Sequence, residues 1–309
     1  MNQTRNEPRF GRVVTAMVTP FDDDGRVDLD GAVTLARWLA GHGSDGLVLT
    51  GSTGESSVLT DGEKTDVWRA VAEAVTIPVI AGSGSNDTAH SVDMTARAKE
   101  CGVDAVLVVT PYYNRPSQAG LYEHFRAVAE AAGGLPVVLY DIPVRSGRRI
   151  AHPTLVRVAH DVPTVVGLKD AAGDPGGTAH LVPRLPSGFE VYSGDDIMTL
   201  PLLAVGAVGV ISVASHWIGP QFGRVIDAFV AGDLAAAIAG NAELLESFDF
   251  ESSEEYPNPL PAKAMCRALG LPAGQCRLPM GRASAELDAQ AAKVLAALGP
   301  PPATGPSLG

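Results

Sequence analysis

The sequence predicts one α/β barrel, a (β/α)8 TIM barrel, with a helical extension at its C-terminal end. The first observation is a recurring unit in which a short apolar strand, a polar loop and a helical stretch follow one another. The unit repeats at about 30 residues, which is the usual length of a βα unit. Eight strand ends can be placed on this pattern, with shorter intervals between the last ones: Thr19, Thr50, Ala81, Thr110, Tyr140, Lys169, Gly194 and Ser212.

The second observation is that reactive polar side chains come directly after these strands. In a closed barrel the loops at the carboxyl ends of all strands meet at one mouth, where barrel enzymes have their active sites. An open, doubly wound sheet would spread the same side chains along a crevice. The spacing alone fits both arrangements, so the open sheet stays as the alternative.

The individual elements follow from the pattern of apolar residues. Residues 13–19 form an apolar run that ends at Pro20, and residues 28–43 carry apolar residues at helical spacing. Residues 200–219 are the most apolar stretch, but prolines and glycines interrupt it, so a helix followed by a strand is predicted there. Further buried strands are predicted at three apolar runs: residues 105–109, 135–139 and 165–168.

From about residue 225 the strand pattern stops and helical periodicity continues alone. We therefore expect a barrel domain at residues 1–232 and a C-terminal helical domain at residues 233–309. The acidic stretch 251–255 is expected to be a solvated loop, and the Pro- and Gly-rich tail from about residue 300 is expected to be disordered. Helices of this domain are predicted at three segments: residues 233–246, 262–269 and 284–298.

The composition is that of an ordinary globular protein and excludes some classes of partner. Hydrophobic residues make up 46% of the 309 residues and charged residues 19%. The net charge of -12 argues against a nucleic-acid partner, which would need a basic face. No membrane span and no secretory signal are expected, and the 3 cysteines, far apart and without a CxxC pair, favour a reducing, cytoplasmic setting.

Lys169 ends the apolar run 165–168 and is the residue that most needs an explanation. Three of the other lysines, Lys64, Lys99 and Lys293, lie in polar helical segments where a solvated ammonium group costs little. Burial disfavours the charged form of an amine and lowers its pKa, which makes a lysine a nucleophile toward a carbonyl. The alternative is a structural lysine that extends its head to solvent from the end of a strand.

Three more segments place functional groups after strands. Residues 51–56 (GSTGES) combine glycines with hydroxyls and can bind a carboxylate through loop N–H groups, although an ordinary strand-to-helix turn explains them equally well. Residues 110–118 (TPYYNRPSQ) contain two tyrosines, and residues 140–147 (YDIPVRSG) contain a tyrosine and an arginine. A phenol beside a Schiff-base lysine can move protons, and an arginine can hold a carboxylate through two hydrogen bonds. Each segment taken alone also has a structural interpretation.

Taken together, these segments resemble the dihydrodipicolinate synthase family of pyruvate-dependent class I aldolases, a superfamily that also contains the N-acetylneuraminate lyases. The resemblance covers roughly residues 12–280 in the order of the family. TPYYNRPSQ and YDIPVRSG discriminate best, because the arginine after the proline is characteristic of the synthases. The motifs that carry the resemblance are GSTGES, IPVIAGSGSNDTAHS, VTPYYNRPSQAGLYEHF, LYDIPVRSG, VGLKDAAGD, YSGDD, GVISV, PNPLPAK and RLPM.

The resemblance implies a condensation of pyruvate with L-aspartate-4-semialdehyde to 4-hydroxy-tetrahydrodipicolinate, the first committed step of diaminopimelate and lysine biosynthesis. Lys169 would form the Schiff base, so neither a metal nor an organic cofactor is expected. A homotetramer built from two tight dimers is implied, with Tyr113 reaching into the neighbouring subunit's site. The implied roles are catalysis for Lys169, Tyr140, Ser52 and Tyr113, and substrate binding for Thr53, Arg145, Gly194 and Ile211.

Two departures from the family pattern are visible. Ser52 stands where most synthases carry a second threonine, and GSTGE is common in neuraminate lyases, although the hydroxyl needed for a proton relay is kept. The second departure concerns the site at which lysine inhibits sensitive members. Ser56, Ser57, Asn86 and Tyr112 match or nearly match that site, whereas Asp61, Lys64 and His90 do not. A cationic Lys64 and a histidine in place of a carboxylate would repel lysine, so weak or absent inhibition is predicted.

Two other functions remain open from the sequence alone. A sister Schiff-base aldolase or lyase would act on a 2-keto sugar acid or on 4-hydroxy-2-oxoglutarate with the same Lys169, and Ser52 mildly favours it. A non-catalytic relative would keep the barrel for binding or regulation. Arg145 favours the synthase over the sister enzyme, and the presence of Lys169, Tyr140 and Tyr113 together argues against a non-catalytic barrel.

Overall fold

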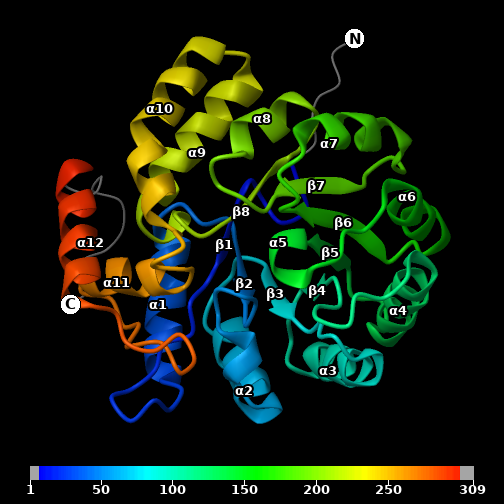
Figure 1. Cartoon of the computed structure of the whole chain (residues 1–309), viewed down its shortest axis with the longest axis horizontal. Helices are drawn as coiled ribbons and strands as arrows, with labels where there is room; N and C mark the ends of the chain where they lie inside the picture. Colours follow the sequence, from blue (N-terminus) through cyan, green and yellow to red (C-terminus); the bar gives the residue numbers. More distant parts are fainter. Residues whose placement is uncertain (1–6, 300–309) are drawn as a thin grey trace.

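The computed structural model describes residues 7–299 and shows a closed barrel of parallel strands surrounded by helices (Figure 1). Each strand pairs with its neighbours in the sequence, and β8 pairs with β1 to close the ring. This confirms the (β/α)8 barrel and excludes the open sheet. The strands within the described residues are β1 (Val13–Ala16), β2 (Gly46–Leu49), β3 (Val79–Gly82), β4 (Ala105–Val109), β5 (Val137–Asp141), β6 (Val165–Asp170), β7 (Glu190–Ser193) and β8 (Gly209–Ser212).

Helices connect successive strands and cover the outside of the barrel (Figure 1). Local capping signals set where several of them begin. Asp28 accepts a hydrogen bond from the backbone N–H of Gly31, and Thr60 forms a capping box with Glu63. The covering helices are α1 (Leu29–Gly41), α2 (Asp61–Ala72), α3 (Thr88–Glu100), α4 (Gln118–Ala131), α6 (His152–Asp161), α7 (Pro175–Leu181), α8 (Thr199–Ala204) and α9 (Ser215–Ala231). The short helix α5 (Pro143–Ser146) lies at the barrel mouth, and 3₁₀ turns are found at η1 (Ser56–Val58) and η2 (Val182–Arg184).

The strands bury side chains on both faces, as expected for a parallel sheet covered by helices. The larger apolar cluster lies between the strands and the helices and includes Leu47 and Leu139. The smaller cluster fills the barrel interior and includes Val48, Val138 and Tyr140. Because successive residues of a strand point to opposite faces, Tyr140 belongs to the interior layer while its neighbour Leu139 packs outward.

The C-terminal segment consists of α10 (Leu234–Phe250), α11 (Leu260–Ala268) and α12 (Ala285–Ala297). Helix α10 packs against α9, and α11 packs against α12 (Figure 1). All three helices agree with the predicted segments, although α10 continues four residues beyond the predicted end at residue 246. The sequence assigned no element to α9, which contains Pro220 and has a non-helical residue at Ile218.

Some expectations are not decided by these elements. The division into domains after residue 232 stays a prediction, and the tail from about residue 300 lies outside the described residues. Between residues 7 and 299, no helix is both long enough and apolar enough to cross a membrane.

Candidate active site

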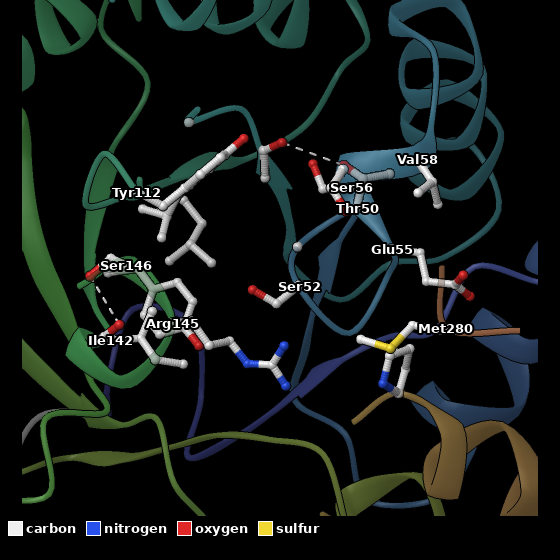
Figure 2. Close-up of a pocket in the computed structure, with 18 of the residues that line it drawn as sticks. Thr50, Ser52, Glu55, Ser56, Val58, Tyr112, Ile142, Arg145, Ser146 and Met280 are labelled. Carbon is white, nitrogen blue, oxygen red and sulfur yellow. Dashed lines mark hydrogen bonds between the residues drawn. The ribbon is translucent and has the colours of Figure 1, made fainter. Parts of the chain in front are cut away.

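A cavity of about 230 Å³ opens where the carboxyl ends of the strands meet their loops (Figure 2). Ser52 and Tyr112 lie on the loops after β2 and β4, and Arg145 lies on the short helix α5 after β5. Met280, from the segment that follows α11, lines the opposite side. In Figure 2 the Arg145 guanidinium points toward the centre of the cavity. Residues from loops far apart in the sequence therefore meet at one barrel mouth, as expected for a closed barrel.

Lys169 lies next to Tyr140 across the pairing of β5 and β6. Its Nζ atom is 4.5 Å from the centre of the Tyr140 ring, and only 5% of the residue is exposed. Burial lowers the pKa of Lys169 to about 8, and the Asp196 and Glu251 carboxylates partly oppose this shift. The expected buried lysine with a lowered pKa is thus present. A side chain that extends to solvent is excluded by this burial.

Tyr140 is a buried phenol whose proton is firmly held at neutral pH. Burial raises the pKa of Tyr140 to about 12, while the positive charge of Arg145 and a hydrogen bond with Ser52 act in the opposite direction. The Tyr140 backbone oxygen accepts a hydrogen bond of 3.0 Å from the Thr110 hydroxyl. The phenol is therefore neutral and can both donate and accept a proton when a reacting group lies beside it.

The loop after β2 is folded into a tight turn. The Glu55 N–H donates to the Ser52 carbonyl oxygen and the Ser56 N–H donates to the Gly51 carbonyl oxygen, each at 3.1 Å. Glu55 adopts a left-handed backbone conformation with φ of 57°. The turn thereby exposes the Ser52 hydroxyl to the cavity (Figure 2).

Asn258 connects the two groups predicted to bind carboxylates, and the sequence did not single it out. Its side-chain N–H donates to the Thr53 hydroxyl at 3.0 Å, and its backbone oxygen accepts a hydrogen bond of 3.1 Å from Arg145. Asn258 belongs to the PNPLPAK motif, which lies just before and within α11. The PNPLPAK motif could have pointed to Asn258 in the sequence. Its position over the barrel mouth, however, depends on long-range packing, which the sequence pattern does not show.

Gly194 lies against Lys169, whereas Ile211 belongs to the interior layer of the barrel. A Cβ atom on Gly194 would lie 2.9 Å from Cγ of Lys169, closer than a side chain tolerates, so only glycine leaves the lysine its space. Ile211 is buried on β8 in the same interior cluster as Tyr140. Both predicted positions are therefore at the barrel mouth or directly beneath it.

Carboxylates surround Lys169 on the side of β7 and β8. The Asp196 carboxylate accepts hydrogen bonds from the backbone N–H of Ala214 at 2.7 Å and from the Ser212 hydroxyl at 2.9 Å. Burial and the nearby Asp196 carboxylate raise the pKa of Glu251 well above the ordinary value. The expectation of a solvated loop at 251–255 is therefore wrong for Glu251, because the longer α10 carries it to the barrel mouth, whereas residues 252–255 are exposed.

Tyr113 is not brought to the cavity of its own chain. Its side chain is 90% exposed and its φ is 70°, whereas the neighbouring Tyr112 lines the cavity. A left-handed conformation is uncommon for a bulky residue and holds the aromatic side chain away from its own barrel. An exposed tyrosine at this position is available to another molecule.

The residues predicted for a lysine site are divided between two places. Ser56 and Ser57 line the cavity together with Tyr112, whereas Asn86 lies outside it. Asp61 and His90 interact with each other, with the His90 Nε2 atom 2.9 Å from Asp61. The pKa of Asp61 is lowered by His90 and, more weakly, by Lys64.

Lys64 is the clearest departure from expectation in this group. The sequence placed it on a solvated helix face, but only 8% of the residue is exposed, and burial lowers its pKa. Helix α2 turns this residue inward because its buried face also carries Val67, Trp68 and Val71. The burial of Lys64 could not be predicted because the neighbouring residues in the sequence are mostly polar.

Metal ligands do not cluster in the described part of the chain. No group of three or more His, Cys, Asp or Glu side chains within residues 7–299 has the geometry to hold a metal ion.

Comparisons with known proteins connect this geometry with a family. A family model described as the dihydrodipicolinate synthetase family matches residues 9–298. A 4-hydroxy-tetrahydrodipicolinate synthase of Symbiobacterium thermophilum is 48% identical over 94% of this chain and 99% of its own length. A protein named 4-hydroxy-tetrahydrodipicolinate synthase 2 of Streptomyces coelicolor is 50% identical over 88% of this chain and 89% of its own. The crystal structure of a synthase from Cyanidioschyzon merolae with lysine bound has a TM-score of 0.92 and 42% identity, and the match covers 95% of this chain and 99% of that one.

Proposed function

The chain belongs to the dihydrodipicolinate synthetase family, and we propose that it is a lyase that condenses pyruvate with L-aspartate-4-semialdehyde to 4-hydroxy-tetrahydrodipicolinate. This reaction is the first committed step toward diaminopimelate and lysine. The single observation that carries the proposal is the buried Lys169 amine with its lowered pKa beside a neutral Tyr140. The names of the relatives at 48% and 50% identity support the synthase over a sister aldolase or a non-catalytic barrel.

The chemistry begins with the neutral Lys169 amine. Its lone pair adds to the ketone carbon of pyruvate, and loss of water leaves an imine. The imine nitrogen draws electrons from the neighbouring methyl group, so a methyl proton leaves and an enamine forms. The enamine carbon then adds to the aldehyde carbon of the semialdehyde, whose oxygen takes up a proton. Attack of the substrate amino group on the imine closes the ring and frees Lys169.

Tyr140, Ser52 and Tyr113 would carry the protons of these steps. The phenol of Tyr140 lies beside the lysine and hydrogen-bonds to Ser52, so a proton can pass between the two hydroxyls. Tyr113, exposed on its own chain, would enter the site of a neighbouring subunit and complete the relay.

Two groups would hold the carboxylates of the substrates. Thr53 and the N–H groups of the loop after β2 would bind the carboxylate of pyruvate, close to Lys169. Arg145, whose guanidinium points into the cavity, would bind the carboxylate of the semialdehyde (Figure 2). Gly194 and Ile211 would contribute backbone contacts around the bound pyruvate. Asn258 supports this assignment because it joins Thr53 to Arg145.

We further propose a cytoplasmic homotetramer built as a pair of tight dimers. The exposed Tyr113 supports a tight dimer in which each subunit completes the site of the other. Each active site needs only one Lys169 and one relay, and a tight dimer supplies both. The association of two dimers would therefore serve to stabilise each tight dimer.

Lysine would inhibit this chain weakly or not at all. The lysine site expected from Ser56, Ser57, Asn86 and Tyr112 would also include Lys64 and His90, and these two side chains would offer a cationic ligand little attraction. A dose-response curve for lysine, measured with both substrates at their KM, is expected to stay flat through cellular concentrations. Half-inhibition within that range would contradict the proposal.

A direct assay separates the synthase from the sister aldolases. Purified chain is supplied with pyruvate and aspartate semialdehyde, and product formation is followed through a coupled reductase. Cleavage of N-acetylneuraminate and of a 2-keto-3-deoxygluconate is measured in parallel. The proposal expects a kcat/KM for the condensation at least about a hundredfold higher than for either cleavage. A higher value for a cleavage reaction would replace the proposed substrate.

A further inference from the structure

Glu55 is a buried carboxylate at the edge of the active-site cavity. It ends the tight turn that holds Ser52 and Thr53, and its side chain lies beside Met280 on the cavity wall (Figure 2). One carboxylate oxygen is 2.6 Å from Nζ of Lys263, and the other accepts a hydrogen bond of 2.9 Å from the backbone N–H of Arg277. Both oxygens are thus held by the C-terminal segment, far from Glu55 in the sequence.

Lys263, on α11, is completely buried. Its ammonium group also donates to the Gln275 carbonyl oxygen at 3.1 Å and lies 3.9 Å from the centre of the Phe21 ring. Burial lowers the pKa of Lys263 and the Glu55 carboxylate raises it. Among the described residues, Glu55 is the one carboxylate within 4 Å of this amine. A charge taken this far from water needs such a partner.

Within residues 7–299, the other cation next to Glu55 is Arg277, and its guanidinium is not free to replace Lys263. The Arg277 guanidinium pairs with Glu63, at 3.0 Å for one nitrogen, and donates to the carbonyl oxygens of Gly25 and Val58. Only its backbone N–H reaches Glu55. Removing the Lys263 charge would therefore leave the Glu55 carboxylate without a cationic partner, held only by two neutral donors, the Arg277 N–H and the Cys276 thiol.

The sign of this charge matters because both proposed substrates are carboxylates. Thr53, proposed to hold the pyruvate carboxylate, lies two residues before Glu55 on the same turn. An uncompensated anion so close to a bound carboxylate repels it, and the repulsion is poorly screened because the groups are out of water. Binding of an anion to this loop thus requires that Glu55 be neutralised.

We propose that Lys263 is a positioning residue of the active site that compensates the charge of Glu55, so that the loop carrying Ser52 and Thr53 keeps its turn and accepts an anionic substrate. The inference rests on the proposed function, because it takes pyruvate as the anion. It also gives the PNPLPAK lysine and the glutamate of GSTGES a shared role.

Three variants test the proposal: Lys263→Met, Glu55→Gln and the two combined. The pyruvate concentration that gives half-maximal trapping of Lys169 by borohydride is measured for each, with KM, kcat and Tm. Lys263→Met is expected to raise the half-saturating concentration about tenfold, with a smaller effect on kcat. Glu55→Gln removes the anion, so the half-saturating pyruvate concentration is expected to stay unchanged or to fall. The combined variant is expected to return to within roughly threefold of the unchanged chain, because neither charge remains.

The direction of these effects separates charge compensation from a general structural role. If the pair only stabilised the fold, both single variants would raise the half-saturating concentration alike, and that result would overturn the proposal. If Lys263→Met does not fold, Glu55→Gln decides alone: an increase of more than about threefold refutes the inference. Lys293→Met, which removes an exposed lysine from α12, serves as the matched control and is expected to have no effect.

Failure of the inference is distinguishable from failure of the proposed function. Without any trapping of Lys169 by pyruvate in the unchanged chain, the proposed function itself fails. With normal trapping in the unchanged chain and equal half-saturating concentrations in all three variants, only the role of Lys263 is refuted.

Discussion

At the scale of single residues, the chemistry depends on one amine whose proton is easily lost. An ordinary lysine has its pKa near 10.5 and is almost entirely charged at neutral pH, whereas burial lowers the pKa of Lys169 to about 8. A useful fraction of the amine is then neutral at the pH of a cell. Tyr140, with its pKa raised to about 12, keeps its proton over the same range. Lys169 can therefore act as the neutral nucleophile while Tyr140 remains available as a proton donor.

The pH dependence of imine formation follows from these values. The neutral amine is the nucleophile, so the rate of trapping by pyruvate and borohydride is expected to rise with pH, to be half-maximal near pH 8 and to level off above it. No fall is expected below pH 11, because Tyr140 remains protonated there. The profile is measured by trapping for a fixed time at each pH from 6 to 11. A midpoint near the ordinary lysine value would show that Lys169 is not desolvated in solution.

At the scale of elements, α11 and the segments on either side of it support the active site. Asn258 joins Thr53 to Arg145, and the turn after β2 is held by contacts with Lys263 and Arg277. The β strands place the lysine and the tyrosine, but this return segment fixes the groups that would bind the substrate carboxylates.

Asn258→Ala tests the contribution of that segment. The variant removes the hydrogen bond to the Thr53 hydroxyl and keeps the backbone contact with Arg145. Loss of one hydrogen bond corresponds to roughly 1 kcal/mol, so KM for pyruvate is expected to rise about fivefold while kcat changes less. Steady-state kinetics measures this split, with Asn241→Ala on α10 as the control. A fall in kcat with KM unchanged would mean that Asn258 acts in the chemical steps instead.

The strands and the residues at their ends could be predicted from the sequence, whereas the residues supplied by the C-terminal helices could not. Strand ends near Tyr140 and Lys169 could be predicted because apolar runs and their spacing are local signals, whereas the closure of the strands into a barrel is decided by the pairing of β8 with β1. Asn258, Glu251 and Lys263 were not visible as site residues, because their roles depend on how α10 and α11 return over the barrel mouth. Long-range packing of this kind leaves no periodic pattern in the sequence.

At the scale of the whole molecule, the proposed relay needs a residue that one chain does not bring to its own cavity. Lys169 and Tyr140 meet in the barrel, but Tyr113, expected as their relay partner, is 90% exposed. A second copy of the chain is the simplest source of the missing tyrosine, and a closed two-fold dimer would exchange it in both directions. Under this proposal the tight dimer would be required for catalysis, because each subunit would supply Tyr113 to the other.

Mixed subunits test whether Tyr113 is shared. Tyr113→Phe and Lys169→Ala are each expected to be nearly inactive. When they are unfolded together and refolded in equal amounts, half of the dimers are mixed, and each mixed dimer contains one complete site, so about a quarter of the original activity should return. Activity of the refolded mixture is compared with that of each variant refolded alone. No recovery would show that Tyr113 serves the site of its own chain or none.

The central claim is that Lys169 forms a Schiff base with pyruvate. The most direct measurement is borohydride reduction of the chain in the presence of pyruvate, followed by proteolysis and mass mapping of the modified peptide. A pyruvate-derived group is expected on Lys169 alone. The Lys169→Ala variant is expected to fold with a Tm close to that of the unchanged chain and to carry no such group. Modification of a different lysine would contradict the account. So would the absence of any modified lysine in a preparation of the chain that is catalytically active.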